Sequence, residues 1–153
     1  MLLGEGGSGK STLLLLLWKK LIADATLLPL YIPLYTYNKE KGSSYIRSEV
    51  KRLYFPAEEG CLPANFFDVN RCILLLDGLD EAEDPSGGLQ EEIAILSSAA
   101  AICIASRQDY QWEATKDFKT WYLEPLPRET IMDYLKEKKI ALPKEETTVQ
   151  LLR

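Results

Sequence analysis

Short apolar runs alternate along the chain with longer stretches in which apolar side chains recur every three or four residues. Strands are expected at residues 1–3, 27–37, 72–76, 101–105 and 121–123. The runs at 72–76 and 101–105 contain only apolar side chains, which is typical of strands buried on both faces of a parallel sheet. Pro29 and Pro33 indicate that the strand at 27–37 lies at a sheet edge or is irregular.

The stretches between the apolar runs have the spacing of amphipathic helices. Helices are expected at residues 9–24, 43–54, 89–97, 128–139 and from 144 onward. One face of the first helix holds Leu14, Leu17, Trp18 and Leu21. Residues 61–67 predict a short helix or loop, and residues 82–88 predict a loop. Strands that alternate with helices in this way favour a three-layer α/β fold around a parallel sheet.

Composition narrows the class of protein. A length of 153 residues and a hydrophobic content of 46% predict one domain with a substantial core. The formal net charge of −5 gives no sign of a basic surface for nucleic acid or an anionic membrane. The chain has no histidine, which excludes Ser-His and Cys-His dyads and His-ligated zinc. No apolar run could span a bilayer and no secretory signal is evident, so we expect a cytoplasmic location.

Residues 4–12 carry the pattern of a phosphate-binding loop: glycine, any four residues, then Gly-Lys-Ser. Glycines let several backbone N–H groups point inward, and the following helix directs the positive end of its dipole at the same phosphates. The predicted nucleotide-binding residues are Gly4, Glu5, Gly6, Gly7, Ser8, Gly9, Lys10, Ser11 and Thr12. Among these, Lys10 would contact the β- and γ-phosphates and Ser11 would bind Mg²⁺. The alternative is a glycine-rich turn before an apolar helix.

A second motif begins where the apolar run at 72–76 meets an acidic sequence, Asp-Gly-Leu-Asp-Glu. A strand that ends in an acid is what a phosphate-binding loop needs, because Asp77 could then hold the Mg²⁺ shell. Asp80 or Glu81 could orient or deprotonate the water that attacks the γ-phosphate. Read alone, the motif could equally be an acidic surface turn. The presence of both motifs in the right order favours a nucleotide hydrolase.

Arg107 follows the apolar strand expected at residues 101–105, which should neighbour the acidic strand. A cation at this position could contact the γ-phosphate and act as a catalytic sensor of its loss. The alternative is a solvated arginine after a strand.

Other nucleotide-binding classes lack their signatures here. The nearest match to the guanine-specificity motif of GTPases, residues 38–41, ends in lysine and comes too early. The sequence at 86–90 is a scrambled form of the ABC-type signature and follows the acidic strand instead of preceding it. A small-molecule kinase normally does without the Asp80-Glu81 pair, because its acceptor replaces water.

The sequence resembles the NACHT module of the STAND class of P-loop NTPases, the type found in NOD-like receptors. The resemblance rests on GEGGSGKSTL at 4–13, PLYIPL at 29–34, LLLDGLDEA at 74–82 and ASR at 105–107. Residues 123–126, followed by a predicted helix, resemble the passage into the helical lid of that family. The acidic motif is the specific one, because many families share the phosphate-binding loop.

The resemblance implies a fold, domains and roles for residues. It implies a parallel-sheet P-loop NTPase of the additional-strand, RecA/AAA-like type, with the core at 1–124 and an incomplete helical lid at 125–153. It implies ATP or ADP with Mg²⁺ as ligands, Ser11 and Asp77 as metal ligands, and Lys10, Asp80, Glu81 and Arg107 as catalytic residues. It also implies a slowly hydrolysing switch that self-associates and signals in innate immunity, cell death or antiphage defence.

Several features of that family are missing from the sequence. In that family the winged-helix region contributes a histidine to the ADP-bound state, and this sequence has no counterpart to it. The sequence also has no counterpart to the fused sensor and effector domains. Only three residues precede the loop, so we expect the sequence to be part of a longer protein, and adenine preference comes from the resemblance alone. Two alternatives to the switch remain: an assembly scaffold that binds nucleotide without turnover, and another P-loop ATPase of the AAA-like group.

Overall fold

Five parallel strands form a sheet in the computed structural model, which describes residues 1–138. The strands are β1 (Leu2–Leu3), β2 (Leu28–Pro33), β3 (Cys72–Asp77), β4 (Ala101–Ser106) and β5 (Trp121–Tyr122). Their order is β2-β3-β4-β1-β5, and every neighbouring pair is parallel. The strand β4 therefore separates β1, which leads into the glycine-rich loop, from β3, which ends in the acidic motif. This is the expected additional-strand arrangement.

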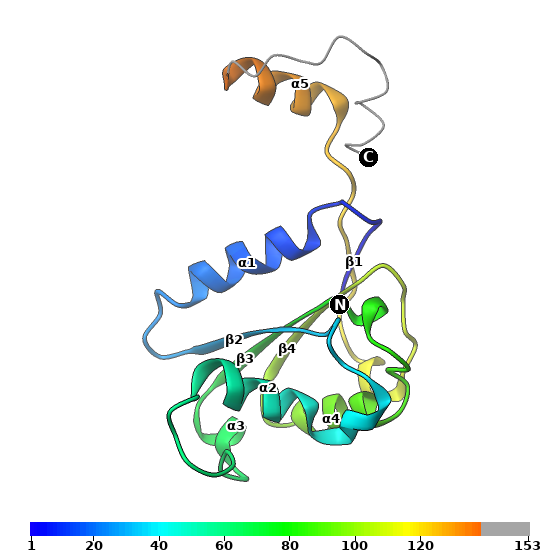
Figure 1. The fold of residues 1–153 in the computed structure, drawn as a ribbon. Coiled ribbons are helices and arrows are strands. Elements are labelled where there is room, and N and C mark those ends of the chain that lie inside the picture. The colour runs from blue at the N-terminus through cyan, green and yellow to red at the C-terminus, as the bar shows by residue number, and fades with distance from the viewer. Residues whose placement is uncertain (139–153) are drawn as a thin grey trace.

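Helices cover both faces of the sheet, which confirms the predicted three layers. The α-helices are α1 (Lys10–Leu21), α2 (Tyr45–Tyr54), α3 (Phe66–Val69), α4 (Gly88–Leu96) and α5 (Arg128–Glu137). Short 3-10 helices are η1 (Lys39–Ser44), η2 (Leu79–Glu81) and η3 (Glu113–Thr115). In Figure 1, α1 lies on one face of the sheet, and α2, α3 and α4 lie on the other. The helix α5 lies apart from the sheet, after an extended segment.

Several element ends differ from the predicted ones. The strand expected at 27–37 ends at Pro33, because the chain then turns and the Tyr37 N–H donates to the Leu34 carbonyl at 2.9 Å. The position of β2 at a sheet edge is confirmed. The first helix ends at Leu21, three residues earlier than expected. The helix expected at 128–139 ends at Glu137, and the helix expected from residue 144 lies outside the described residues.

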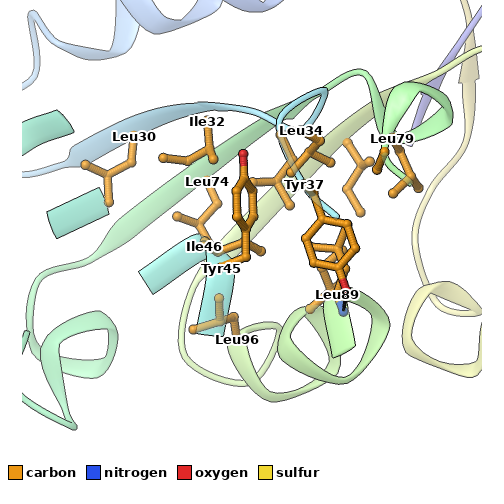
Figure 2. Packing of buried hydrophobic residues seen from close by; sticks show 14 of the residues in the cluster. Leu30, Ile32, Leu34, Tyr37, Tyr45, Ile46, Leu74, Leu79, Leu89 and Leu96 are labelled. Carbon is orange, nitrogen blue, oxygen red and sulfur yellow. Dashed lines mark hydrogen bonds between the residues drawn. The ribbon is translucent and has the colours of Figure 1, made fainter. Parts of the chain in front are cut away.

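The sheet has a large core on one face and a small one on the other. Figure 2 shows the large core, in which Leu30, Ile32 and Leu74 of the sheet face α2 and α4. The small core, on the α1 face, has four buried residues: Leu2, Leu14, Leu75 and Ala105. Successive residues of β3 point to opposite faces, so Leu74 belongs to the large core and Leu75 to the small one.

A buried glutamate joins two helices beneath the large core. Glu92 of α4 is 2% exposed, and its carboxylate accepts the backbone N–H groups of Ile46 and Arg47 at 2.8 and 2.9 Å. These N–H groups belong to the first turn of α2, where no carbonyl of the same helix can accept them. Burial raises the pKa of Glu92, while the two hydrogen bonds oppose that shift. The carboxylate therefore acts as an N-terminal cap supplied by a neighbouring helix.

Candidate functional site

The glycine-rich loop connects the end of β1 to the start of α1, as the motif predicts. Gly9 immediately precedes α1 with a φ of 94°, a left-handed conformation that favours glycine. Gly4 is needed for a different reason: a Cβ atom there would lie 2.7 Å from the carbonyl oxygen of Leu123. The loop is therefore held both by its own backbone geometry and by close packing against the segment that follows β5.

The Lys10 side chain folds back across this loop. Its ammonium group donates to the carbonyl oxygens of Gly4 at 2.7 Å and Glu5 at 2.8 Å. An ammonium group has three N–H donors, so one remains for a ligand. Lys10 thus stabilises the loop and places a positive charge beside the groups that would receive phosphate.

The acidic motif lies at the carboxyl end of β3 and in the turn that follows. Asp77 is half-buried, and its Oδ2 accepts a hydrogen bond from the Tyr31 hydroxyl at 2.6 Å. Burial, reinforced by the hydrogen bond to Asp77, raises the pKa of Tyr31, so the hydroxyl stays protonated and donates. This tyrosine lies on β2, the edge strand, within the stretch 29–34 that carries part of the resemblance, but it was not among the predicted site residues.

Arg107 joins the other two carboxylates of the motif. Its backbone N–H donates to Asp80 Oδ1 at 2.8 Å, and its Nε lies 3.2 Å from Asp80 Oδ2. Its Nη2 lies 2.8 Å from Glu81 Oε1. The Asp80 side chain is only 7% exposed, whereas Arg107 and Glu81 are about half exposed. The expected proximity of β4 to the acidic strand is confirmed, and it brings these three charges into one cluster.

These groups surround a cleft of about 330 Å³ at the carboxyl ends of the strands, a size typical of small-molecule sites. The predicted site residues that line it are Gly6, Gly7, Gly9, Lys10, Ser11, Thr12, Asp77, Asp80, Glu81 and Arg107. Three predicted residues do not line it: Gly4, Glu5 and Ser8. Gly4 packs against Leu123, and the Ser8 hydroxyl is buried without a hydrogen-bond partner among the described residues.

The cleft also contains residues that were not among the predicted site residues. Tyr31, Pro33 and Tyr35 line it from β2 and the turn that follows. The signal that could have found Tyr31 is the register of the sheet, in which Tyr31 pairs with Leu75 and Pro33 with Asp77. This register places Tyr31 and Asp77 on the same face. The register could not be read from the apolar pattern of either strand alone.

The donor set suits a magnesium ion that arrives with a nucleotide. Ser11 and Asp77 both line the cleft and offer oxygen atoms, and Mg²⁺ favours such oxygen donors. Within residues 1–138, no group of three or more His, Cys, Asp and Glu side chains could hold a metal ion. Because Mg²⁺ usually takes one or two protein ligands and completes its shell with water and phosphate, two donors are sufficient.

Comparison with solved structures supports the fold. The structure of Cdc6p from Pyrobaculum aerophilum matches 90% of this chain with a TM-score of 0.64 and 20% sequence identity. The chain has a P-loop NTPase fold. The match covers 41% of the Cdc6p chain, so this chain spans less than half of that protein's length. No protein-family model and no curated protein matches the sequence. Across the described residues, no helix is long and apolar enough to cross a membrane.

Proposed function

We propose that the chain is an ATP-binding module that hydrolyses ATP slowly, in the manner of AAA-like P-loop ATPases. The observation that carries this proposal is the cleft, which collects the loop after β1, the acid at the end of β3 and the arginine after β4. These segments are far apart in the sequence and supply the backbone donors, cation and carboxylates that phosphoryl transfer requires. The fold match to Cdc6p supports the proposal at the level of architecture.

Each group in the cleft has a proposed task. The loop N–H groups and Lys10 bind the phosphates, and Ser11 and Asp77 hold Mg²⁺, which neutralises phosphate charge when bound. Asp80, or Glu81 beside it, orients the attacking water. Arg107 has two sets of partners, the carboxylates that it contacts in this structure and the γ-phosphate of a bound nucleotide. Its exchange between them would couple the state of the nucleotide to the acidic turn.

The finer proposal is a nucleotide switch of the NACHT type, and it rests on the sequence resemblance. The acidic motif at 77–81 and the arginine after β4 support it. In such a switch the nucleotide controls self-association, and innate immunity, cell death and antiphage defence are the settings that the resemblance suggests.

Because Arg107 engages Asp80 and Glu81, nucleotide binding without turnover is the second candidate function. Light scattering with ADP and with a non-hydrolysable ATP analogue would test whether the nucleotide controls assembly.

Binding of nucleotide is tested by thermal unfolding of the wild type and of Lys10→Ala. At a concentration of Mg·ADP about 100-fold above Kd, mass action stabilises the native state by about 2.7 kcal/mol. For a chain of this size, that raises the Tm of the wild type by roughly 5–10 °C. Lys10→Ala should show no shift, because it lacks the ammonium group that binds phosphate. A wild-type Tm that does not respond to Mg·ADP or Mg·ATP would contradict the proposal.

Turnover is tested in the same preparations by release of inorganic phosphate from Mg·ATP. Asp80→Asn should keep the thermal shift and lose phosphate release, because the amide cannot orient water as the carboxylate does. Phosphate release that persists in Asp80→Asn would remove this residue from the proposed mechanism. Absence of release in the wild type, with binding intact, would favour the second candidate. Mass spectrometry of any nucleotide freed when the purified chain is denatured would identify the base.

A further inference from the structure

The Tyr31 hydroxyl lies in the cleft and donates to the acidic motif, and the tasks proposed above do not include it. It donates to one oxygen of Asp77, Oδ2, at 2.6 Å and leaves the other oxygen available. A carboxylate oxygen has two lone pairs, and an unrestrained carboxylate rotates about its last torsion angle. The hydrogen bond from Tyr31 fixes that rotation.

Tyr31 is itself held at the sheet edge by side chains from both flanking layers. The Tyr54 hydroxyl accepts the Tyr31 N–H at 2.7 Å and donates to the Tyr31 carbonyl at 3.1 Å. An edge strand has no neighbour for its outer N–H and C=O groups, and Tyr54 of α2 supplies both partners. Two residues earlier, Trp18 of α1 donates its indole N–H to the Pro29 carbonyl at 3.1 Å. The backbone that carries the Tyr31 ring is therefore braced on each side.

We propose that Tyr31 is the positioning residue for Asp77 as a Mg²⁺ ligand, which rests on the proposed nucleotide-binding function. Groups that hydrogen-bond to a metal ligand fix its orientation, and their removal typically weakens metal affinity by 10–100-fold. Tyr31 acts only through Asp77, so its hydroxyl should matter for the response to Mg²⁺ and not for the contacts between the loop and phosphate.

The experiment measures ADP affinity by isothermal titration calorimetry, first in EDTA and then at increasing Mg²⁺. In Tyr31→Phe the affinity for ADP in EDTA should stay within about twofold of the wild type, because the loop is untouched. Mg²⁺ should increase the affinity for ADP, and the Mg²⁺ midpoint is the concentration at which half of that increase is reached. In Tyr31→Phe this midpoint should rise roughly tenfold. Tyr35→Phe is the matched control, since Tyr35 lines the same cleft but is 62% exposed and does not bond to Asp77. Its Mg²⁺ midpoint should equal that of the wild type.

A second pair of variants separates positioning from general damage. If Tyr31 acts through Asp77, then Tyr31→Phe should cause no further change in the Mg²⁺ response when Asp77→Asn is already present. Tyr54→Phe keeps the Tyr31 hydroxyl but removes the hydrogen bonds between the Tyr54 hydroxyl and the Tyr31 backbone. The Mg²⁺ midpoint of Tyr54→Phe should therefore fall between those of the wild type and Tyr31→Phe.

The outcomes distinguish the two proposals. A wild type that binds no ADP in EDTA or in Mg²⁺ overturns the proposed function. A wild type that responds to Mg²⁺, together with a Tyr31→Phe variant of unchanged midpoint, overturns the positioning role alone. The same conclusion follows if the two substitutions at Tyr31 and Asp77 have additive effects, or if Tyr31→Phe weakens ADP binding equally in EDTA and in Mg²⁺.

Discussion

The two faces of the sheet are packed to very different extents. The face toward α2 and α4 buries residues from four strands and from the helices α2, α3 and α4, and it includes a buried, capped helix start. The face toward α1 has four buried residues, and α1 itself buries only Leu14. Beside α1 lies an apolar groove of about 630 Å³ whose lining includes Leu2, Leu14 and Leu17. The same sheet is thus well supported on one side and thinly supported on the other.

This difference matters because the glycine-rich loop belongs to the thinly supported side. The loop leads directly into α1, whereas the acidic motif begins at the end of β3, an interior strand of the sheet. Regions with few buried apolar contacts open locally at lower free energy than the rest of a fold. A nucleotide that contacts both the loop and the strand ends would therefore stabilise the weaker side most.

The strongest test of the comparison uses two adjacent residues of β3, because Leu74 and Leu75 are both 0% exposed and point to opposite faces. Leu74→Ala should lower the free energy of unfolding by about 4 kcal/mol, since the dense core cannot collapse around the cavity. Leu75→Ala should cost about 3 kcal/mol, because the small core beside the groove can relax more. Urea denaturation of both variants measures the difference. Equal losses, or a larger loss for Leu75→Ala, would show that the two faces support the sheet alike.

Glu92 provides a test of intermediate size on the well-packed face. Glu92→Ala leaves the N–H groups of Ile46 and Arg47 without their acceptor, which should cost about 2 kcal/mol. Glu92 has a pKa of 4.5 in the unfolded chain, and burial raises it in the native state. Between pH 4.5 and the raised native pKa, the native state therefore binds more protons than the unfolded state. The contribution of Glu92 is then complete below pH 4.5 and declines as pH rises through the raised native pKa.

The destabilisation by Glu92→Ala should consequently be larger at about pH 4 than at about pH 8. Chemical denaturation of both proteins at the two pH values measures it. A loss that grows with pH would mean that the carboxylate is stabilised by the fold and has a lowered pKa.

The smallest effect is expected on the outer side of α1. Leu16 is 59% exposed, so Leu16→Gln should change the free energy of unfolding by less than about 0.5 kcal/mol. Glutamine is nearly as good a helix former as leucine, so helix propensity does not confuse the comparison. Denaturation under the conditions used for the β3 variants is the measurement. A loss above about 1 kcal/mol would mean that the α1 face is more tightly packed than the structure indicates.

Much of the architecture could be predicted from the sequence because its signals are local. Apolar runs located β3 and β4, the prolines favoured an edge position for β2, and the motifs placed Lys10 at the start of α1 and Asp77 at the end of β3. The additional-strand order came from the resemblance, since apolar runs say nothing about which strands are neighbours.

What the sequence did not predict depends on contacts between distant elements. The bond from Tyr31 to Asp77 requires the register of two strands. The ion pairs of Arg107 require the side-chain geometry of a turn and a strand end. The consecutive leucines at 13–17 of α1 are mostly exposed, because burial depends on what packs against a helix and not on its composition.

The first glycine of the loop illustrates how a motif can carry two kinds of information. A side chain at Gly4 would collide with the carbonyl of Leu123, so this glycine is required by the path of the chain after β5 whether or not a phosphate binds. A descendant of this chain that lost its ligand would still keep Gly4 as long as it kept the sheet. Lys10 would then be kept only for its hydrogen bonds to the Gly4 and Glu5 carbonyls, so Lys10 records the ligand more directly than Gly4, which records the fold.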